Sequence, residues 1–239
     1  MLNRQCAGSQ WGTRRVWPIK RGMQIAISGN IGAGKTELTK LLARHYGYRS
    51  VFGPQEENPY LGSFYEDMRR WSFNMMVHSL CAASAQLADL TAAGVSFVRD
   101  RSLYDDAAIF APNLNSMGLL TSRDLATYTR LFDLTRSLLP GPDLLIYVRG
   151  DVPTLIRHIQ KRGRELESSI RLDYLANLND RYEKWAASYE GKLLVVDTDE
   201  LDFVERREDL GRIIEKIDAE FNGLFAGTGY GREEGRTKA

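Results

Sequence analysis

One octapeptide constrains this chain more than any other feature of its sequence. Residues 29–36 read Gly-Asn-Ile-Gly-Ala-Gly-Lys-Thr and fit the pattern G-x-x-x-x-G-K-[ST], which chance would produce in roughly one chain of this length in a hundred. The apolar run 25–27 precedes it as a predicted strand, and residues 36–42 follow as a predicted helix. In that placement the loop N–H groups and the start of the helix converge on one anion. The octapeptide therefore predicts a phosphate-binding loop.

Every residue of this loop is a candidate nucleotide contact: Gly29, Asn30, Ile31, Gly32, Ala33, Gly34, Lys35 and Thr36. The glycines allow the backbone to curl around phosphate oxygens. Lys35 would supply a point charge to the β and γ phosphates, and the Thr36 hydroxyl a ligand to Mg²⁺. The alternative is an ordinary glycine-rich turn followed by a lysine.

The pattern of elements around the loop predicts an α/β fold. Short apolar runs rich in β-branched residues alternate with longer helical patterns, which is typical of a parallel sheet covered on both faces. The predicted strands are 24–28, 49–52, 95–99, 144–148 and 193–196. The predicted helices are 35–46, 71–93, 122–138, 152–161, 172–189 and 204–221, with Asp151 as a candidate N-cap of the fourth. We expect a doubly wound sheet of five parallel strands flanked by helices.

The two ends of the chain differ from the rest. Residues 1–22 carry five Lys or Arg, no Asp or Glu, and no helical periodicity. We expect a disordered basic leader or synthesis from Met23, and the alternative is an organelle transit peptide. Residues 226–239 are Gly-rich and charged, which is typical of a frayed tail. Residues 23–225 contain no repeat or linker, so we expect them to form one phosphate-loop domain.

Charge and cysteine content exclude several partners. The chain has 32 Lys plus Arg against 31 Asp plus Glu, a formal net charge of +1. No global basic field therefore indicates a nucleic-acid polymer or an acidic membrane as the partner. No stretch approaches the roughly 18 uninterrupted apolar residues of a membrane span. The isolated Cys6 and Cys81 predict neither a disulfide nor a thiolate metal site, and a cytoplasmic location is expected.

A phosphate-binding loop alone does not distinguish three classes of nucleotide-binding protein: kinases, motor NTPases and GTPase switches. A guanine-reading tetrapeptide of the Asn-Lys-x-Asp kind is absent from the sequence. A motor usually carries an apolar strand that ends in a Mg²⁺-binding acid. The nearest acid of that kind is Asp100, after the run 95–98, and Arg101 and Ser102 follow it directly.

Several short motifs, taken in order, resemble the bacterial deoxynucleoside kinase family, which includes deoxyadenosine, deoxyguanosine and deoxycytidine kinases. The likeness extends over nearly the whole expected domain. It is carried by the phosphate loop, Glu57-Asn58-Pro59-Tyr60-Leu61, Phe64-Tyr65-Glu66-Asp67, Asp100-Arg101-Ser102, Tyr104-Asp105-Asp106, Ile109-Phe110-Ala111, Arg162-Gly163-Arg164, Tyr174-Leu175 and Arg181-Tyr182-Glu183.

The resemblance implies transfer of the γ-phosphate of ATP, with Mg²⁺, to the 5′-hydroxyl of a deoxynucleoside. It also implies a mobile lid and a homodimer. Lys35 and Arg101 would act on the reacting phosphate and the 5′ end, and Asp100 would assist at the metal. Arg162 and Arg164 would clamp the donor phosphates when the lid closes. The alternative for these two arginines is a solvated helix end.

Three further side chains match substrate positions of the family. Glu167 has the spacing from Arg164 at which the family places the carboxylate that binds the sugar 3′-hydroxyl. Tyr65 would reach the same sugar edge, and its alternative is a ring packed beside Phe64. Asp106 would contribute to base selection, and its alternative is an acid on a helix surface.

The sequence departs from the family at the positions that serve the acceptor. Glycine, as Gly53, stands where the family places the Glu that acts as general base. Glu56 and Glu57 are the nearest candidates to replace it, and the alternative for both is an exposed loop carboxylate. Met76 and Ala83 stand where the family has a base-reading Gln and an Arg, two helical turns apart. These changes predict a more apolar acceptor pocket.

A further departure is His158, which stands at the entrance of the lid where many relatives carry an Arg. Two functions from different classes follow from the whole pattern. The first is a deoxynucleoside kinase, a purine being the favoured base, with altered or reduced activity. The second is a non-catalytic nucleotide-binding member of the family that acts as a scaffold or regulator. A kinase for a nucleotide or a modified nucleoside is a third alternative.

Overall fold

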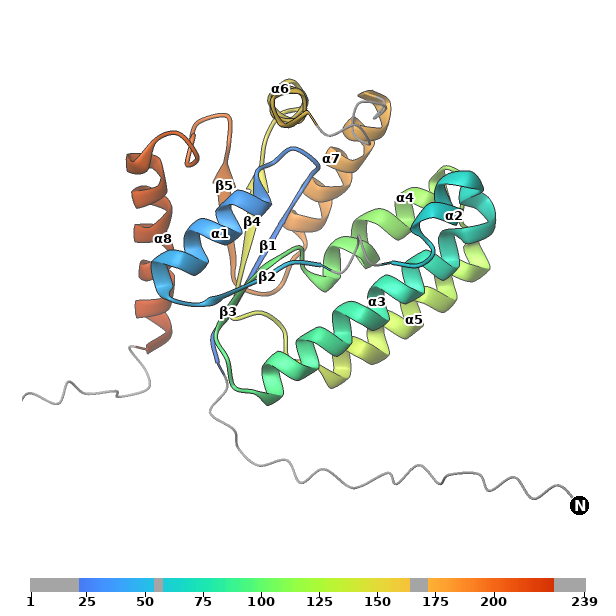
Figure 1. Cartoon of the computed structure of the whole chain (residues 1–239), viewed down its shortest axis with the longest axis horizontal. Helices are drawn as coiled ribbons and strands as arrows, with labels where there is room; N and C mark the ends of the chain where they lie inside the picture. The colour runs from blue at the N-terminus through green and yellow to red at the C-terminus, as the bar shows by residue number, and fades with distance from the viewer. Residues whose placement is uncertain (1–21, 54–57, 164–171, 226–239) are drawn as a thin grey trace, which may run out of the picture.

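A five-stranded sheet forms the centre of the molecule. The structure is a computed structural model and describes residues 22–53, 58–163 and 172–225. All strand pairs are parallel, and the order is β2-β3-β1-β4-β5, as Figure 1 shows. The strands are β1 (Gln24–Gly29), β2 (Arg49–Val51), β3 (Phe97–Asp100), β4 (Leu144–Arg149) and β5 (Leu193–Asp197). The predicted α/β class and its five parallel strands are confirmed.

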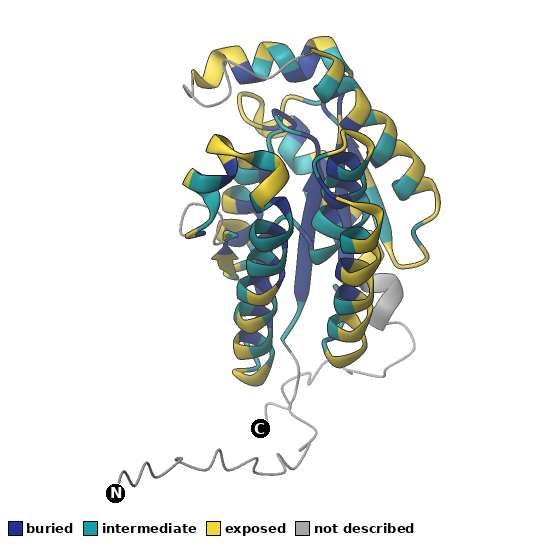
Figure 2. Cartoon of the chain, turned by 90° about the vertical axis from the view of Figure 1, so that its right-hand side faces the viewer, coloured by how far each residue is buried: buried dark blue, intermediate teal, exposed yellow. Residues whose placement is uncertain are grey.

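Helices cover both faces of this sheet. They are α1 (Lys35–Tyr46), α2 (Leu61–Glu66), α3 (Met68–Ala92), the π-helical turn η1 (Asp105–Phe110), α4 (Ala111–Ser116), α5 (Ser122–Leu138), α6 (Val152–Arg162), α7 (Leu172–Ala187) and α8 (Arg207–Phe225). Side chains of α1 and α8 pack on one face, whereas α3 and α7 pack on the other, with α5 beside α3. The central strands β1, β3 and β4 are largely buried between these layers (Figure 2), whereas the edge strands β2 and β5 are partly exposed.

Local sequence explains where these elements form. β1 is buried along its whole length, and β4 is buried except at its last residue, as near-continuous apolar runs predict for central parallel strands. The buried positions of α3 are 72, 76, 80, 83, 87 and 90, which form one stripe with helical spacing. Leu87 and Leu90 of this stripe pack against β2 and β3, whereas Met76 and Leu80 pack with α2, α4 and α5. Asp151 caps α6 as predicted, since its carboxylate accepts a hydrogen bond from the Thr154 N–H at 2.7 Å.

Some element predictions are wrong at their ends or missing. α2, η1 and α4 were not predicted, because each spans only six residues and is too short to show a helical period. α3 begins at Met68 rather than 71, since the Asp67 carboxylate caps it. β3 begins at Phe97 rather than 95, and α8 at Arg207 rather than 204.

The termini and two inner segments lie outside the described residues. They include the predicted leader as far as residue 21 and the predicted tail. In the part that is described, none of the helices combines the length and the apolar character that a bilayer span requires.

Candidate active site

The phosphate loop joins β1 to α1, as predicted, and its glycines are structurally required. Gly32 and Gly34 adopt φ values of 84° and 88°, a region that side chains with a Cβ rarely enter. A Cβ on Gly32 would lie 2.6 Å from the Leu155 carbonyl oxygen, and one on Gly34 would lie 3.0 Å from Phe203 Cζ. The loop therefore packs closely under α6 and the segment before α8, and its backbone has room only for glycine at these two positions.

Hydrogen bonds hold the loop against the helices above it. The Asn30 side-chain amide donates to the Leu175 carbonyl oxygen at 3.0 Å and to Asn179 Oδ1 at 3.1 Å, both on α7. His158 of α6 contacts the Gly32 carbonyl oxygen through Nδ1 at 2.9 Å. The sequence marked His158 only as a departure from the family, whereas the structure places it on the phosphate loop. The side chains of Ala33, which is fully buried, and Ile31, which is half-buried, pack in the core, so a nucleotide contact by these two residues would be made through their backbone N–H groups.

Lys35 is a buried cation at the start of α1. Its side chain is 8% exposed, and Nζ donates to the Asn30 carbonyl oxygen at 2.8 Å. Burial, followed by the positive charge of Arg101, lowers its pKa to about 8, against the opposing effect of Asp100. An anion beside Nζ would offset this cost, which is the electrostatic condition expected of a site that takes phosphate.

Thr36 and Asp100 meet at the edge of the sheet. The Thr36 hydroxyl donates to Asp100 Oδ2 at 2.5 Å, and Asp100 Oδ1 is buried without a hydrogen-bond partner. One hydroxyl and one carboxylate with a free oxygen fit Mg²⁺, which takes few protein ligands and completes its shell with water and phosphate oxygens. The described residues contain no group of three or more His, Cys, Asp or Glu that could hold a metal alone.

Arg101 is held in an unusual backbone conformation. It is the one non-glycine residue with positive φ, 69°, among those described, and such strain persists where the surroundings enforce it. Its guanidinium lies 4.7 Å from the centre of the Phe110 ring. Burial opposes its charge, but Tyr182, Asp106 and other acidic neighbours outweigh that effect and raise its pKa. Arg101 therefore stays charged beside Lys35 and Asp100.

Asp105 supports this arrangement, and the sequence analysis assigned it no role. It is fully buried, and its Oδ2 accepts hydrogen bonds from Ser28 Oγ at 2.6 Å and Ser102 Oγ at 2.6 Å. Its Oδ1 accepts from the Tyr182 hydroxyl at 2.8 Å. Asp105 thus ties the ends of β1 and β3 to α7. Asp105 and Tyr182 each belong to a motif that carries the family resemblance, Tyr104-Asp105-Asp106 and Arg181-Tyr182-Glu183. These two motifs were the only indication in the sequence that the pair has a role.

A cleft opens beside these groups between β3 and α3. It encloses about 350 Å³, open space at its mouth included. Its lining consists of Gly53, Ser79, Ala83, Arg99, Asp100, Arg101, Ser102, Leu103 and Asp106. Burial, against the opposing charge of Arg101, raises the pKa of Asp106 to about 6. The cleft therefore combines two arginines and two carboxylates with a wall that lacks side chains at Gly53 and has only a methyl group at Ala83.

The two other predicted acceptor residues that the structure describes, Met76 and Tyr65, differ in their burial. Met76 is 2% exposed and packs with Phe64, Leu80 and Tyr128, so it belongs to the helical layer and not to the cleft lining. Tyr65 is 54% exposed, and its ring lies 5.4 Å from that of Phe64. Its predicted contact with the sugar stays a prediction.

The predicted lid is described only in part. Arg162 is exposed at the end of α6, where Gly163 ends the helix at φ 64°. Its charge is close enough to contribute to the lowered pKa of Lys35. The other predicted residues of the lid and the acceptor loop lie outside the described residues: Arg164, Glu167, Glu56 and Glu57.

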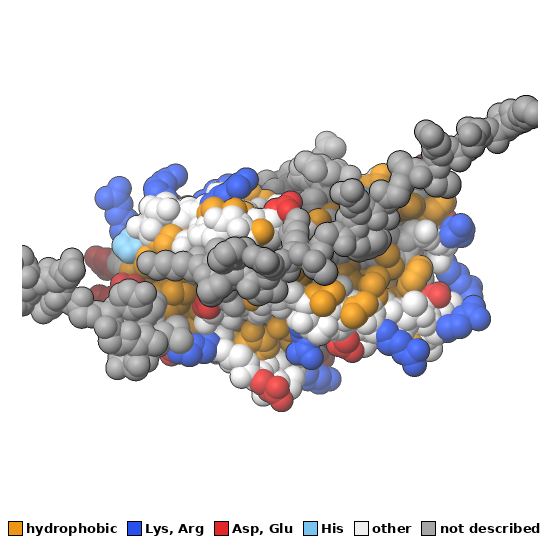
Figure 3. Space-filling view, turned by 90° about the horizontal axis from the view of Figure 1, so that it is seen from below, with side chains coloured by type: hydrophobic (Ala, Val, Ile, Leu, Met, Phe, Trp, Pro, Cys, Tyr) orange, Lys and Arg blue, Asp and Glu red, His pale blue; other side chains and the backbone are white. Residues whose placement is uncertain are grey.

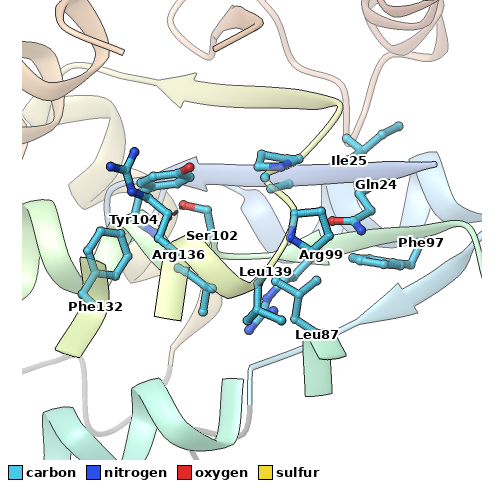
Figure 4. Close-up of a pocket in the computed structure, with 15 residues that line it drawn as sticks. Gln24, Ile25, Leu87, Phe97, Arg99, Ser102, Tyr104, Phe132, Arg136 and Leu139 are labelled. Atoms are coloured by element: carbon cyan, nitrogen blue, oxygen red, sulfur yellow. Dashed lines mark hydrogen bonds between the residues drawn. The ribbon is translucent and has the colours of Figure 1, made fainter. Parts of the chain in front are cut away.

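A second cavity adjoins the cleft, and Arg99 lines both of them. It encloses about 480 Å³, its mouth included, and Gln24, Leu87, Phe97, Arg99, Ser102, Tyr104, Phe132, Arg136 and Leu139 are among its lining residues, as Figure 4 shows. Its walls are mainly apolar, and Arg99, Ser102 and Leu103 line both spaces. Arg99 therefore lies at the boundary between them.

Comparisons with known proteins match this arrangement to one family. A profile described as "Deoxynucleoside kinase" matches residues 25–222. The chain is 33% identical over 202 residues to the deoxyadenosine/deoxycytidine kinase of Bacillus subtilis, covering 83% of this chain and 93% of the relative. It is 35% identical over 198 residues to the deoxyguanosine kinase of the same organism, covering 79% and 93%.

Solved structures agree with the sequence matches. The deoxyadenosine kinase from M. mycoides with bound dCTP superimposes with a TM-score of 0.69 at 30% identity, covering 82% of this chain and all of that one. The same kinase with bound dATP gives 0.68 at 31% identity, covering 82% of this chain and 99% of that one. The predicted resemblance is thus confirmed over most of the chain, which belongs to the deoxynucleoside kinase family.

Proposed function

We propose that this protein transfers the γ-phosphate of ATP to the 5′-hydroxyl of a deoxynucleoside, a purine deoxynucleoside being the favoured acceptor. The observation that carries the proposal is the hydrogen bond from Thr36 to Asp100 beside the buried Lys35. It brings the phosphate loop and the end of β3 together at the edge of the cleft. Relatives named for deoxyadenosine, deoxycytidine and deoxyguanosine support the acceptor class.

The residues of the site would act mainly by positioning and by charge. Phosphoryl transfer passes through a loose transition state in which negative charge spreads over the transferred group. Mg²⁺ held at Thr36 and Asp100 would offset charge on the donor phosphates. Lys35 would contact the β and γ phosphates from the loop, and Arg101 would face the group in transfer from the cleft side. The 5′-hydroxyl oxygen would then attack the γ-phosphorus as the bond to ADP breaks.

The cleft lacks a carboxylate at the position of the family's general base. Gly53 lines the cleft but offers no group that can accept the proton of the 5′-hydroxyl. General-base catalysis typically contributes about 10²–10⁴ in rate. We therefore propose that the protein is a slow kinase compared with one that has a glutamate at this position.

Gly53 also favours a second candidate function. A family member that binds nucleotide without transferring phosphate would keep Lys35, Thr36 and Asp100 and tolerate the loss of the base. The two functions differ in one measurable property, because only the kinase consumes ATP in the presence of a deoxynucleoside.

The test is ATP consumption with each of the four common deoxynucleosides. We expect turnover with at least one purine deoxynucleoside and a decrease of about 10² or more in Lys35→Ala, since removal of one charge-stabilising donor typically costs that much. Lys40→Ala is a matched control, because Lys40 lies on the same helix and its exposed side chain pairs with Glu37. Tight binding of ATP with no turnover for any acceptor would favour the second function.

A further inference from the structure

Arg99 is a buried cation that forms no ion pair with any of the described residues. The residue is only 5% exposed. Its one hydrogen bond to described residues runs from Nη1 to the Ala83 carbonyl oxygen at 3.3 Å, and its Nε is buried without a partner. Burial lowers its pKa despite the charges of Asp106 and Asp105. A guanidinium in this state is costly unless a further acceptor compensates it.

The alternation of β3 directs Arg99 toward the acceptor cleft. Val98 packs in the core with α1 and α8, whereas Phe97 packs with Leu87 of α3. Side chains two residues apart share a face of a strand, so Arg99 points toward α3 as Phe97 does. Figure 4 shows it beside Leu87 and Leu139.

The short residues of the cleft provide the room for this guanidinium. Ala83 contributes a methyl group and Gly53 no side chain to the lining that they share with Arg99. An arginine at position 83, as the family pattern has it, would project from α3 into the same space. In this cleft the guanidinium groups of the lining therefore come from the end of β3 and not from α3.

We propose that Arg99 is a specificity-determining residue that donates its free Nε–H to a carbonyl oxygen on the base of the acceptor, so that this enzyme favours a 6-oxopurine deoxynucleoside over a 6-aminopurine one. The proposal rests on the kinase function proposed above and names the acceptor of that same site. A guanidinium has only donors, and it matches a carbonyl oxygen better than an exocyclic amino group. An amide side chain pairs well with adenine, and an arginine pairs well with guanine. In this chain Met76 stands where the family has the base-reading Gln, so that amide is missing.

The test compares deoxyguanosine and deoxyinosine, which carry the 6-oxo group, with deoxyadenosine. We expect the wild type to have a higher kcat/KM for the two 6-oxopurines. Arg99→Met keeps an unbranched apolar side chain as far as the Nε position and removes the charge and all donors. We expect it to lower kcat/KM for deoxyguanosine at least tenfold, to change that for deoxyadenosine less than threefold, and to leave the KM for ATP unchanged. Arg136→Met is the control, because exposed Arg136 lines only the neighbouring cavity.

Stability separates this role from a structural one. Because Arg99 forms no ion pair with the described carboxylates, Arg99→Met should unfold at the same temperature as the wild type or at a higher one. Equal losses for all acceptors, or a wild type that prefers deoxyadenosine, would overturn the proposal. Absence of turnover in the wild type would be a failure of the kinase function instead. In that case, binding of deoxyguanosine by the wild type and not by Arg99→Met would still support the contact, and no binding by either would overturn it.

Discussion

Buried charges define the site at the level of single residues. Lys35 and Arg99 are less than a tenth exposed, and neither forms an ion pair with a described carboxylate. The octapeptide predicted the first of these from sequence, because its spacing is specific. Arg99 escaped prediction because a strand residue before an Asp-Arg-Ser triplet has no motif that marks it. Its role depends on what surrounds it, namely Ala83 and Gly53, which come together only in the fold.

Asp106 makes the stability of the protein depend on pH. Its pKa in the folded state is raised to about 6 from 3.8, chiefly by burial. Between pH 3.8 and about 6 the folded state keeps the proton on Asp106, whereas the unfolded state has lost it. The protonated carboxyl therefore stabilises the folded state at low pH, and this stabilisation is lost as the pH rises through about 6. Asp106→Asn removes the titrating group. We measure the free energy of unfolding in urea for both proteins at pH 4 and pH 8. We expect the value for the variant minus that for the wild type to be larger at pH 8 than at pH 4.

The same difference between variant and wild type at both pH values would contradict the raised pKa of Asp106. The groups whose charges act on this carboxyl are Arg101, Asp105 and Arg99.

Restoring a carboxylate at position 53 tests the missing base. Gly53→Glu would place an acceptor for the 5′-hydroxyl proton on the cleft lining. We expect kcat with the preferred deoxynucleoside to rise at least tenfold, because a well-placed general base typically supplies about 10²–10⁴ in rate and an added glutamate would recover part of that. Gly53→Gln, of the same shape but unable to take the proton, is the control. If both variants behave alike in steady-state kinetics, a missing base does not limit this enzyme.

At the level of elements, the β1–α1 turn is the part that the sequence predicted best. A motif that requires its own backbone conformation fixes both the strand before it and the helix after it. The helices α2, η1 and α4 were missed because each has only six residues. η1 positions Asp105 and Asp106, so a segment whose helical turn was not predicted carries residues that organise the cleft.

The phosphate loop should be intolerant of a single methyl group. In Gly32→Ala the new Cβ would meet the Leu155 carbonyl oxygen at 2.6 Å, and the residue would keep a left-handed φ that costs about 1–2 kcal/mol. We expect ATP binding, measured by calorimetry, to fall below detection. Gly211→Ala in α8 meets nothing within 4 Å and should bind ATP normally, with about 0.5–1 kcal/mol more stability. Normal binding by Gly32→Ala would show that the loop rearranges freely.

At the level of the whole molecule, the outer surface of α5 carries unexplained apolar side chains. Leu134 and Leu138 are 58% and 74% exposed and lie one helical turn apart on one face. Figure 3 shows hydrophobic side chains among Lys and Arg on the part of the surface where α3 and α5 lie. This is consistent with the homodimer that the family resemblance implies.

Charging this surface should therefore change the oligomeric state. We expect light scattering to give a dimer for the wild type and a monomer for the double variant Leu134→Asp, Leu138→Asp. Val204→Asp is a control, since Val204 is also 54% exposed but precedes α8. A wild type that is monomeric at all concentrations, or a double variant that remains dimeric, would place the dimer elsewhere or remove it.

The most direct measurement is the identity of the product. ATP labelled at its γ-phosphate, Mg²⁺ and deoxyguanosine are incubated with the wild type and with Lys35→Ala, and the labelled compounds are separated. With the wild type we expect a deoxynucleoside that carries the labelled phosphate at its 5′-oxygen, and with Lys35→Ala almost none. A wild type that binds ATP but labels neither deoxyguanosine nor any other common deoxynucleoside would contradict it.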